Sequence, residues 1–181
     1  MKGRKGDWMQ TFTGVAFYPL DPRAEDVRLQ DIAHSLAHQC RYNGHCRAFY
    51  SVAQHSVLVS DWLRAHGRSE LEVWGLLHDA AEAYTGDIVR PIKRSLPAVA
   101  AMEEPVERAI SERFRLIWPM PAEVKRADNA VLLAEARDLM GPPPQPWSDR
   151  GEEPWPSAIT PWAPEEARKI FLQVAARLGV Y

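Results

Sequence analysis

The stretch LEVWGLLHDAAEAYTGDIVRPIK, residues 71–93, decides the fold class. It predicts a helix that begins near Glu70 and ends near Gly86, because glycine readily accepts the left-handed backbone angles found at helix ends. Pro91 follows and marks a break in the helical pattern. The chain has almost no alternating strand pattern elsewhere, so the sequence predicts an all-α fold.

Further helices are expected on both sides of this one, which gives a bundle of about six helices. Asp31 is a plausible cap for the first of them, and Ser51 with Gln54 has the spacing of a capping box. Pro105 predicts a bend, since its ring cannot sit in a helix interior without displacing a turn. The expected ranges are residues 31–40, 51–67, 98–118, 121–140 and 164–179.

Two segments lack a helical pattern. Residues 1–29 mix aromatic residues with glycine and proline, and we expect an irregular N-terminal arm, with room for a short hairpin, that lies over the core. Residues 141–163 are rich in proline and tryptophan, which predicts an ordered loop packed as a lid or edge. With 181 residues, 46% of them hydrophobic, we expect residues 1–181 to form a single domain.

Composition excludes several classes of function. The net charge is only −2, so nothing global draws the protein to a nucleic acid polymer or an anionic membrane. No apolar run approaches the roughly 20 residues that span a bilayer, and the N-terminus lacks the apolar stretch of a secretory signal, so we expect a cytoplasmic protein. Cys40 and Cys46 are too few for a disulfide framework and are expected to be free thiols.

Four potential metal ligands lie on three of the predicted helices: His55, the adjacent pair His78 and Asp79, and Asp128. The two histidines interrupt otherwise apolar helical faces, and a buried acid such as Asp79 needs a charged partner or a metal. Two imidazoles with two carboxylates suit Mn, Fe, Co, Ni or Zn better than Mg, which is the less natural choice. We therefore expect one divalent transition metal held between the central helices.

Two further acids border this predicted metal site. Glu82 lies one helical turn after Asp79 and on the same face, and Asp87 follows just past the helix end. A carboxylate next to a metal can orient the water that the metal activates or carry its proton. Metal-activated hydrolysis is therefore the expected reaction class.

The order H, then HD, then D on successive helices resembles the signature of the HD phosphohydrolase superfamily. More closely, VAQHS followed by GLLHDAAEAYTGDIVRPIK resembles the bacterial 5'-deoxynucleotidase branch and its phage relatives that hydrolyse deoxynucleoside triphosphates, including a dATP triphosphohydrolase. The resemblance implies that Glu82 acts on the attacking water and that Asp87 helps to place the nucleotide or that water. It also implies the metal ligands His55, His78, Asp79 and Asp128.

The same resemblance points to substrate-binding residues. In this branch an arginine followed by an aromatic residue lies near the phosphate and sugar, and the matching residues in CRYNGH are Arg41 and Tyr42. Lys93, after the TGD turn, offers a second cation to phosphate oxygens. Gln54 stands where the family usually has an acid before the first histidine, and it receives no catalytic role.

Less specific interpretations apply to several of these residues. Asp128 could instead be a surface acid paired with Lys125 or Arg126. A zinc site built from the histidines and cysteines between His34 and Cys46 does not fit common ligand spacings. We expect His34 and His38 to lie around the pocket near Arg41, and the two tryptophans Trp62 and Trp74 to belong to the core.

The predicted function is the metal-dependent hydrolysis of a small deoxynucleotide. Release of orthophosphate from a monophosphate and removal of a longer phosphate chain from a triphosphate both stay open, and a pocket closed by Trp147 or Trp155 would set the choice. The alternatives are a nucleotide sensor without turnover and a hydrolase of guanosine alarmones. We also expect self-association, most simply as a symmetric dimer.

Overall fold

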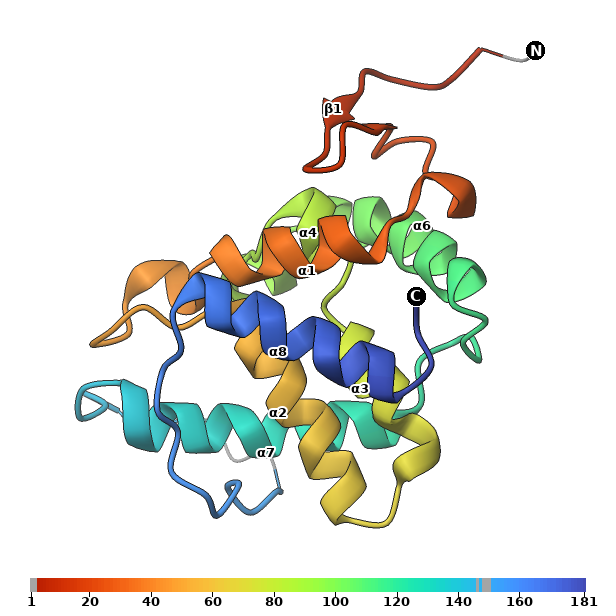
Figure 1. The fold of residues 1–181 in the computed structure, drawn as a ribbon. Coiled ribbons are helices and arrows are strands. Elements are labelled where there is room, and N and C mark those ends of the chain that lie inside the picture. Colours follow the sequence, from red (N-terminus) through yellow and green to blue (C-terminus); the bar gives the residue numbers. More distant parts are fainter. Residues whose placement is uncertain (1–2, 146, 148–150) are drawn as a thin grey trace.

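The computed structural model describes residues 3–145, 147 and 151–181. These residues are mainly helical, which confirms the all-α fold class (Figure 1). Two short strands, β1 (Met9–Gln10) and β2 (Ala16–Phe17), pair antiparallel as a hairpin in the N-terminal arm. The helices are α1 (Leu29–His38), α2 (Val52–Ala65), α3 (Glu72–Leu77), α4 (Glu82–Thr85), α5 (Arg90–Ser95), α6 (Pro97–Arg113), α7 (Ala122–Leu139) and α8 (Pro164–Arg177).

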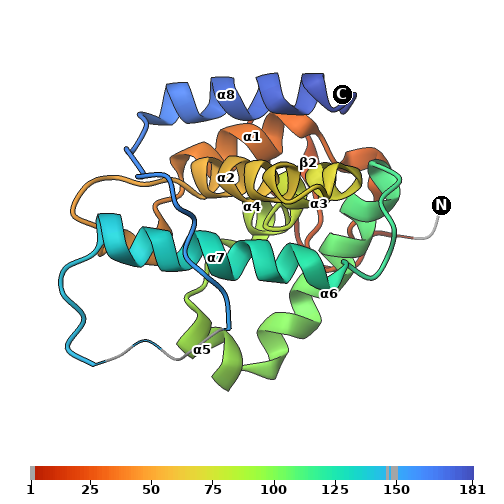
Figure 2. The ribbon, with the colours of Figure 1, turned by 90° about the horizontal axis from the view of Figure 1, so that it is seen from below.

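Helix α2 is the centre of the bundle. It contacts α1, α3, α7 and α8, and Figure 2 shows it between α8 on one side and α7 on the other. Fully buried side chains such as Ile32, Leu36 and Phe171 fill the space between α1, α2 and α8. Trp62 and Trp74 belong to a second cluster between α2, α3 and α7, which confirms that they are core residues. The central helix is thus held on several sides, and it carries His55.

The starts of α1 and α2 show what local sequence could predict. Ser51 caps α2 as expected, and its side chain accepts a hydrogen bond from the Gln54 backbone N–H at 3.1 Å. The Gln54 side chain does not return the bond to the cap, because it is directed to the loop before α8. The prediction for Asp31 was wrong. Helix α1 begins two residues earlier, and Asp31 lies buried in its first turn, where it accepts bonds from the Thr13 N–H at 2.7 Å and hydroxyl at 2.9 Å.

The predicted helix from Glu70 to Gly86 is divided. Residues 69–71 form a 3-10 turn, α3 ends at Leu77, and α4 begins only at Glu82. Gly86 ends α4 with a φ of 85°, as its residue type suggested. Pro91 also lies in the first turn of an additional helix, α5. Proline is tolerated at this position because a backbone N–H there would have no partner within the helix. These two differences account for the eight helices in the described ranges instead of about six.

The last three helices agree more closely with the expected ranges. Helix α6 runs through Pro105 but ends at Arg113, before the predicted end at residue 118. Helices α7 and α8 match residues 121–140 and 164–179 to within two residues at each end. Among the described residues of 141–163 there is no helix or strand. Trp155 packs beside the cluster between α2 and α7, so this part of the loop is packed as predicted.

The arm is anchored at its second strand. Phe17 is fully buried and stacks on Tyr84, with 3.8 Å between ring centroids.

Cys40 and Cys46 are both free thiols. Among the described residues, no helix is long and apolar enough to cross a membrane.

Candidate active site

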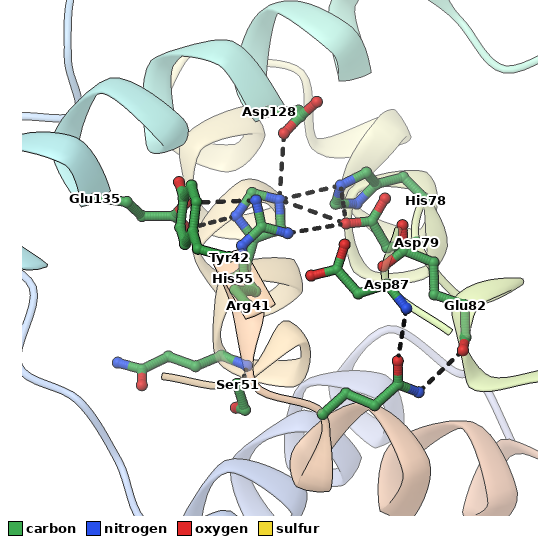
Figure 3. A network of polar contacts seen from close by, with 12 residues as sticks. Arg41, Tyr42, Ser51, His55, His78, Asp79, Glu82, Asp87, Asp128 and Glu135 are labelled. Atoms are coloured by element: carbon green, nitrogen blue, oxygen red, sulfur yellow. Dashed lines mark hydrogen bonds and ion pairs between the residues drawn. The ribbon is translucent and has the colours of Figure 1, made fainter. Parts of the chain in front are cut away.

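His55, His78 and Asp128 come together although they are far apart in the sequence. One ligand atom from each lies within 4.8 Å of the others. The His55 Nε2 atom is 3.2 Å from the His78 Nε2 atom and 3.3 Å from Asp128 Oδ1. Figure 3 shows these side chains pointing toward one another from α2, from the segment after α3 and from α7. They form the only group of this kind within the described ranges.

Asp79 reaches the same place. Its Oδ2 atom lies 3.2 Å from His78 Nε2 and 3.7 Å from His55 Nε2. The same oxygen is 3.3 Å from the Arg41 guanidinium. Burial alone would raise the pKa of Asp79, but the neighbouring His78, His55 and Arg41 hold it below its usual range. All four predicted ligands are therefore adjacent.

His78 and Asp79, two consecutive residues, lie in the break between α3 and α4. A regular α-helix is held by bonds from each N–H to the carbonyl four residues before it. From residue 77 to residue 84 the backbone instead forms tighter bonds, including Ala80 N–H to Leu77 O at 3.0 Å and Glu82 N–H to Asp79 O at 3.0 Å. These three-residue spacings are those of a 3-10 turn. His78 and Asp79 lie in this turn, which the helix-forming sequence did not reveal.

The two imidazoles are arranged as metal ligands. His78 Nδ1 is 2.8 Å from the Gly75 carbonyl oxygen, and since a carbonyl only accepts, Nδ1 carries a proton. His55 Nδ1 is 2.6 Å from Glu135 Oε1 and donates to that carboxylate. Both rings therefore direct their Nε2 atoms toward each other, as histidine ligands do when a hydrogen bond at the other ring nitrogen fixes the ring for a metal. A divalent cation fits this set of atoms.

The surrounding charges favour a cation as well. Burial and Arg41 both oppose a proton on His55, yet Glu135 and Asp128 raise the pKa of His55 to about 9. Asp128 also pairs with Lys125 at 2.5 Å and with Arg90 at 2.6 Å. The surface pair considered for Asp128 thus exists, but Asp128 is only 4% exposed and contacts His55 at the same time.

Glu135 is the principal residue that the sequence did not single out. It lies on α7 about two helical turns after Asp128, and it is fully buried. Burial would raise its pKa, but Arg41 and His55 lower the pKa of Glu135 to about 2. A buried acid on the same helical face as a predicted ligand was the available signal.

A cavity of about 640 Å³ opens beside these ligands. Its wall contains two aromatic rings, Tyr42 and Trp147, and apolar side chains such as Leu132 and Met140. Trp147 meets the edge of the Tyr42 ring, with 6.2 Å between centroids. Every predicted catalytic or substrate-binding residue lines this cavity together with two ligands and further cations: Arg41, Tyr42, Asp79, Glu82, Asp87, Arg90, Lys93, Arg94, Lys125 and Asp128. Trp155 is not among the lining residues.

Glu82 and Asp87 are fixed by Gln39, which the sequence did not indicate. The Gln39 amide donates to the Glu82 carbonyl at 2.9 Å, and its oxygen accepts from the Asp87 N–H at 3.0 Å. Burial and the nearby Asp79 raise the pKa of Glu82, and burial also raises the pKa of Asp87. Lys93 lines the cavity but pairs with Glu82 at 3.4 Å and with Glu103 at 3.0 Å, so its cation is shared with two acids.

His34 and His38 do not lie around the cavity. His34 stacks on Phe12 of the arm at 3.8 Å, and His38 Nδ1 bonds to the His34 carbonyl at 2.8 Å. The spacing of one helical turn places His34 and His38 together on one face of α1, but that face contacts the N-terminal arm. His45, in contrast, lines the cavity.

Comparison with known proteins identifies the family of this chain. Residues 43–140 match the profile of the family described as 5'-deoxynucleotidase YfbR-like. The chain is 42% identical to the uncharacterized protein YfdR of Escherichia coli K12 over 132 residues, 73% of this chain and 72% of YfdR. It is 34% identical to an uncharacterized protein of Rhodobacter capsulatus over 139 residues, 74% of this chain and 71% of that protein. The chain belongs to the YfbR-like 5'-deoxynucleotidase family of HD-domain hydrolases.

Proposed function

We propose that this protein is a metal-dependent 5'-deoxynucleotidase that releases orthophosphate from deoxynucleoside 5'-monophosphates. The observation that carries the proposal is the cavity of about 640 Å³, which has imidazoles and carboxylates beside it and cationic and aromatic side chains in its wall. Its volume is in the range of small-molecule sites. The family description supplies the choice of a deoxynucleotide.

His55, His78, Asp79 and Asp128 would hold one divalent transition metal. That metal, when bound, supplies an activated water at neutral pH and neutralises charge on the phosphate. The nitrogen and oxygen donors favour Mn, Fe, Co, Ni or Zn.

The chain's own residues complete the reaction. Water adds to phosphorus, the bond from phosphorus to the sugar oxygen breaks, and the proton that the water loses ends on that oxygen as the deoxynucleoside leaves. We assign to Glu82 the orientation of the water and the acceptance of its proton. Since Asp79 is one cause of the raised Glu82 pKa, a cation held by Asp79 would offset that cause and favour the ionised form of Glu82.

The remaining lining residues bind the substrate in this proposal. Arg41 and Arg94 face the phosphate, and Asp87 helps to place the nucleotide or its water. Tyr42 and Trp147 form the wall for the sugar and base, since aromatic faces stack on bases. Lys93 keeps its proposed role toward phosphate oxygens, although it also contacts Glu82.

The test is product analysis on nucleoside and deoxynucleoside mono- and triphosphates with Mn, Co, Zn or Mg. The proposal expects orthophosphate from deoxynucleoside monophosphates, lost in Asp128→Asn. The matched control is Asp61→Asn, a carboxylate on α2 that pairs with Arg64 and lies outside the cavity. Tripolyphosphate from triphosphates with untouched monophosphates would reject the monophosphatase. Tight binding without release would indicate a sensor, and turnover of guanosine alarmones alone would contradict the deoxynucleotide assignment.

A further inference from the structure

Glu135 connects two parts of the site that lie on different segments of the chain. Its Oε1 atom accepts from His55 Nδ1 at 2.6 Å and from the Tyr50 hydroxyl at 2.8 Å. Its Oε2 atom accepts from the Tyr42 hydroxyl at 2.5 Å and lies 3.4 Å from the Arg41 guanidinium. One oxygen therefore holds a proposed metal ligand, and the other holds the cavity wall (Figure 3).

The wall segment that Glu135 holds has an unusual backbone. Tyr42 and Asn43 have φ values of 57° and 51°, the left-handed region that residues other than glycine rarely adopt. Such conformations persist where surrounding contacts hold them. The contacts here are the Tyr42–Glu135 bond, the Arg41 N–H bond to Tyr50 O at 2.9 Å and the His45 N–H bond to Tyr42 O at 3.0 Å.

We propose that Glu135 is a positioning residue that couples occupation of the metal site to the conformation of the cavity wall at residues 41–45. The proposal rests on the proposed metal site but not on the identity of the substrate. A cation on His55 Nε2 withdraws electron density from the ring, so Nδ1–H donates more strongly to Glu135. The stronger bond restricts rotation of the carboxylate, so its other oxygen stays in position to accept from the Tyr42 hydroxyl.

Arg41 provides a competing connection, because it contacts both Asp79 and Glu135. A metal that recruits Asp79 would change Arg41 directly. The experiment must therefore remove the Tyr42–Glu135 bond and leave Arg41 in place. Tyr42→Phe does this. Tyr50→Phe is the matched control, because it deletes the same group from the same carboxylate at a tyrosine that does not line the cavity.

The readout is hydrogen exchange of backbone amides in residues 41–45, followed by mass spectrometry with and without Co²⁺ and without any nucleotide. In the wild-type protein and in Tyr50→Phe, we expect Co²⁺ to slow exchange on the order of tenfold, the effect of strengthening one charge-assisted hydrogen bond. In Tyr42→Phe we expect the slowing to disappear. If Tyr42→Phe retains it, the connection runs through Arg41 and Asp79, and the proposal is wrong.

A second variant tests the metal side of the same residue. Glu135→Gln keeps the shape of the side chain but removes the negative charge that accepts from His55 Nδ1–H. The Co²⁺ affinity should therefore fall about 10–100-fold, and the visible absorption spectrum of the bound cobalt should change. Unchanged affinity and spectrum would overturn the proposal. Cobalt-dependent protection without any nucleotide turnover would contradict the proposed function alone, whereas turnover with full protection in Tyr42→Phe would contradict this inference alone.

Discussion

Replacement of Gly75 by alanine tests how closely α2 and α3 must approach to form the site. A Cβ atom at position 75 would lie 2.7 Å from Leu63 Cδ1, 2.9 Å from Ser60 Cα and 3.0 Å from Ser60 N. The leucine end can rotate away, but the Ser60 backbone belongs to α2 and cannot move alone. The Gly75 carbonyl also accepts the His78 Nδ1–H bond, so separation of the helices displaces a proposed ligand.

The expected cost combines two opposing effects. Overpacking of a core contact costs about 1–3 kcal/mol, while alanine in place of a helical glycine returns about 1 kcal/mol. The net loss is up to about 2 kcal/mol, or a Tm lower by up to about 8 °C for a chain of this size. Thermal unfolding by circular dichroism and Co²⁺ titration measure both effects.

Gly141→Ala is the matched control for this variant. Gly141 has nothing within 4 Å of an added Cβ and no positive φ, so its Tm and Co²⁺ affinity should stay near those of the wild type. A Gly75→Ala protein with unchanged Tm and unchanged Co²⁺ affinity would refute the close approach of α2 and α3 as a condition for placing His78.

Three other changes have definite expected results. Ser51→Ala removes the cap of α2 and should lower the free energy of unfolding, measured by denaturant titration, by about 1 kcal/mol. A variant as stable as the wild type would contradict this prediction. Gln54→Leu removes two hydrogen bonds of 2.8 Å, one to the Thr160 carbonyl and one from the Trp162 N–H. Limited proteolysis should therefore cut residues 141–163 faster than in the wild type. Equal rates would show that other contacts hold the loop. When the free metal concentration is about 100 times the Kd, chelation of the metal should lower the free energy of unfolding by about 2.7 kcal/mol. Added Zn²⁺ or Co²⁺ should then restore the Tm. A Tm that does not respond to the chelator would argue against a bound metal.

The proposed metal ligands could be identified from the sequence because their residue types conflict with their positions. His55 and His78 interrupt apolar faces, and an acid such as Asp128 on a helix with buried neighbours needs a partner. Glu135 satisfies the same criterion and lies on the same face as Asp128. The nearby charged residues Arg137, which is exposed, and Asp138, which is half-buried, give this part of the helix a polar sequence that does not mark Glu135 as buried.

Features set by tertiary contacts could not be predicted in the same way. Ala80 and Ala81 are strong helix formers, so the 3-10 turn that contains His78 and Asp79 has little local signal. The helical spacing of His34 and His38 was informative, but which element covers that face depends on where the arm packs. Gln39 meets Glu82 and Asp87 only after the chain has folded.

The central claim is that one metal ion, held beside this cavity, is required for hydrolysis of a deoxynucleotide. The most direct measurement is orthophosphate release from a deoxynucleoside 5'-monophosphate while Co²⁺ is added stepwise to metal-free protein. The account predicts no release without metal and a rate that rises until one ion is bound per chain. Full activity in the metal-free protein, or cobalt binding at that ratio with no phosphate released, would contradict it.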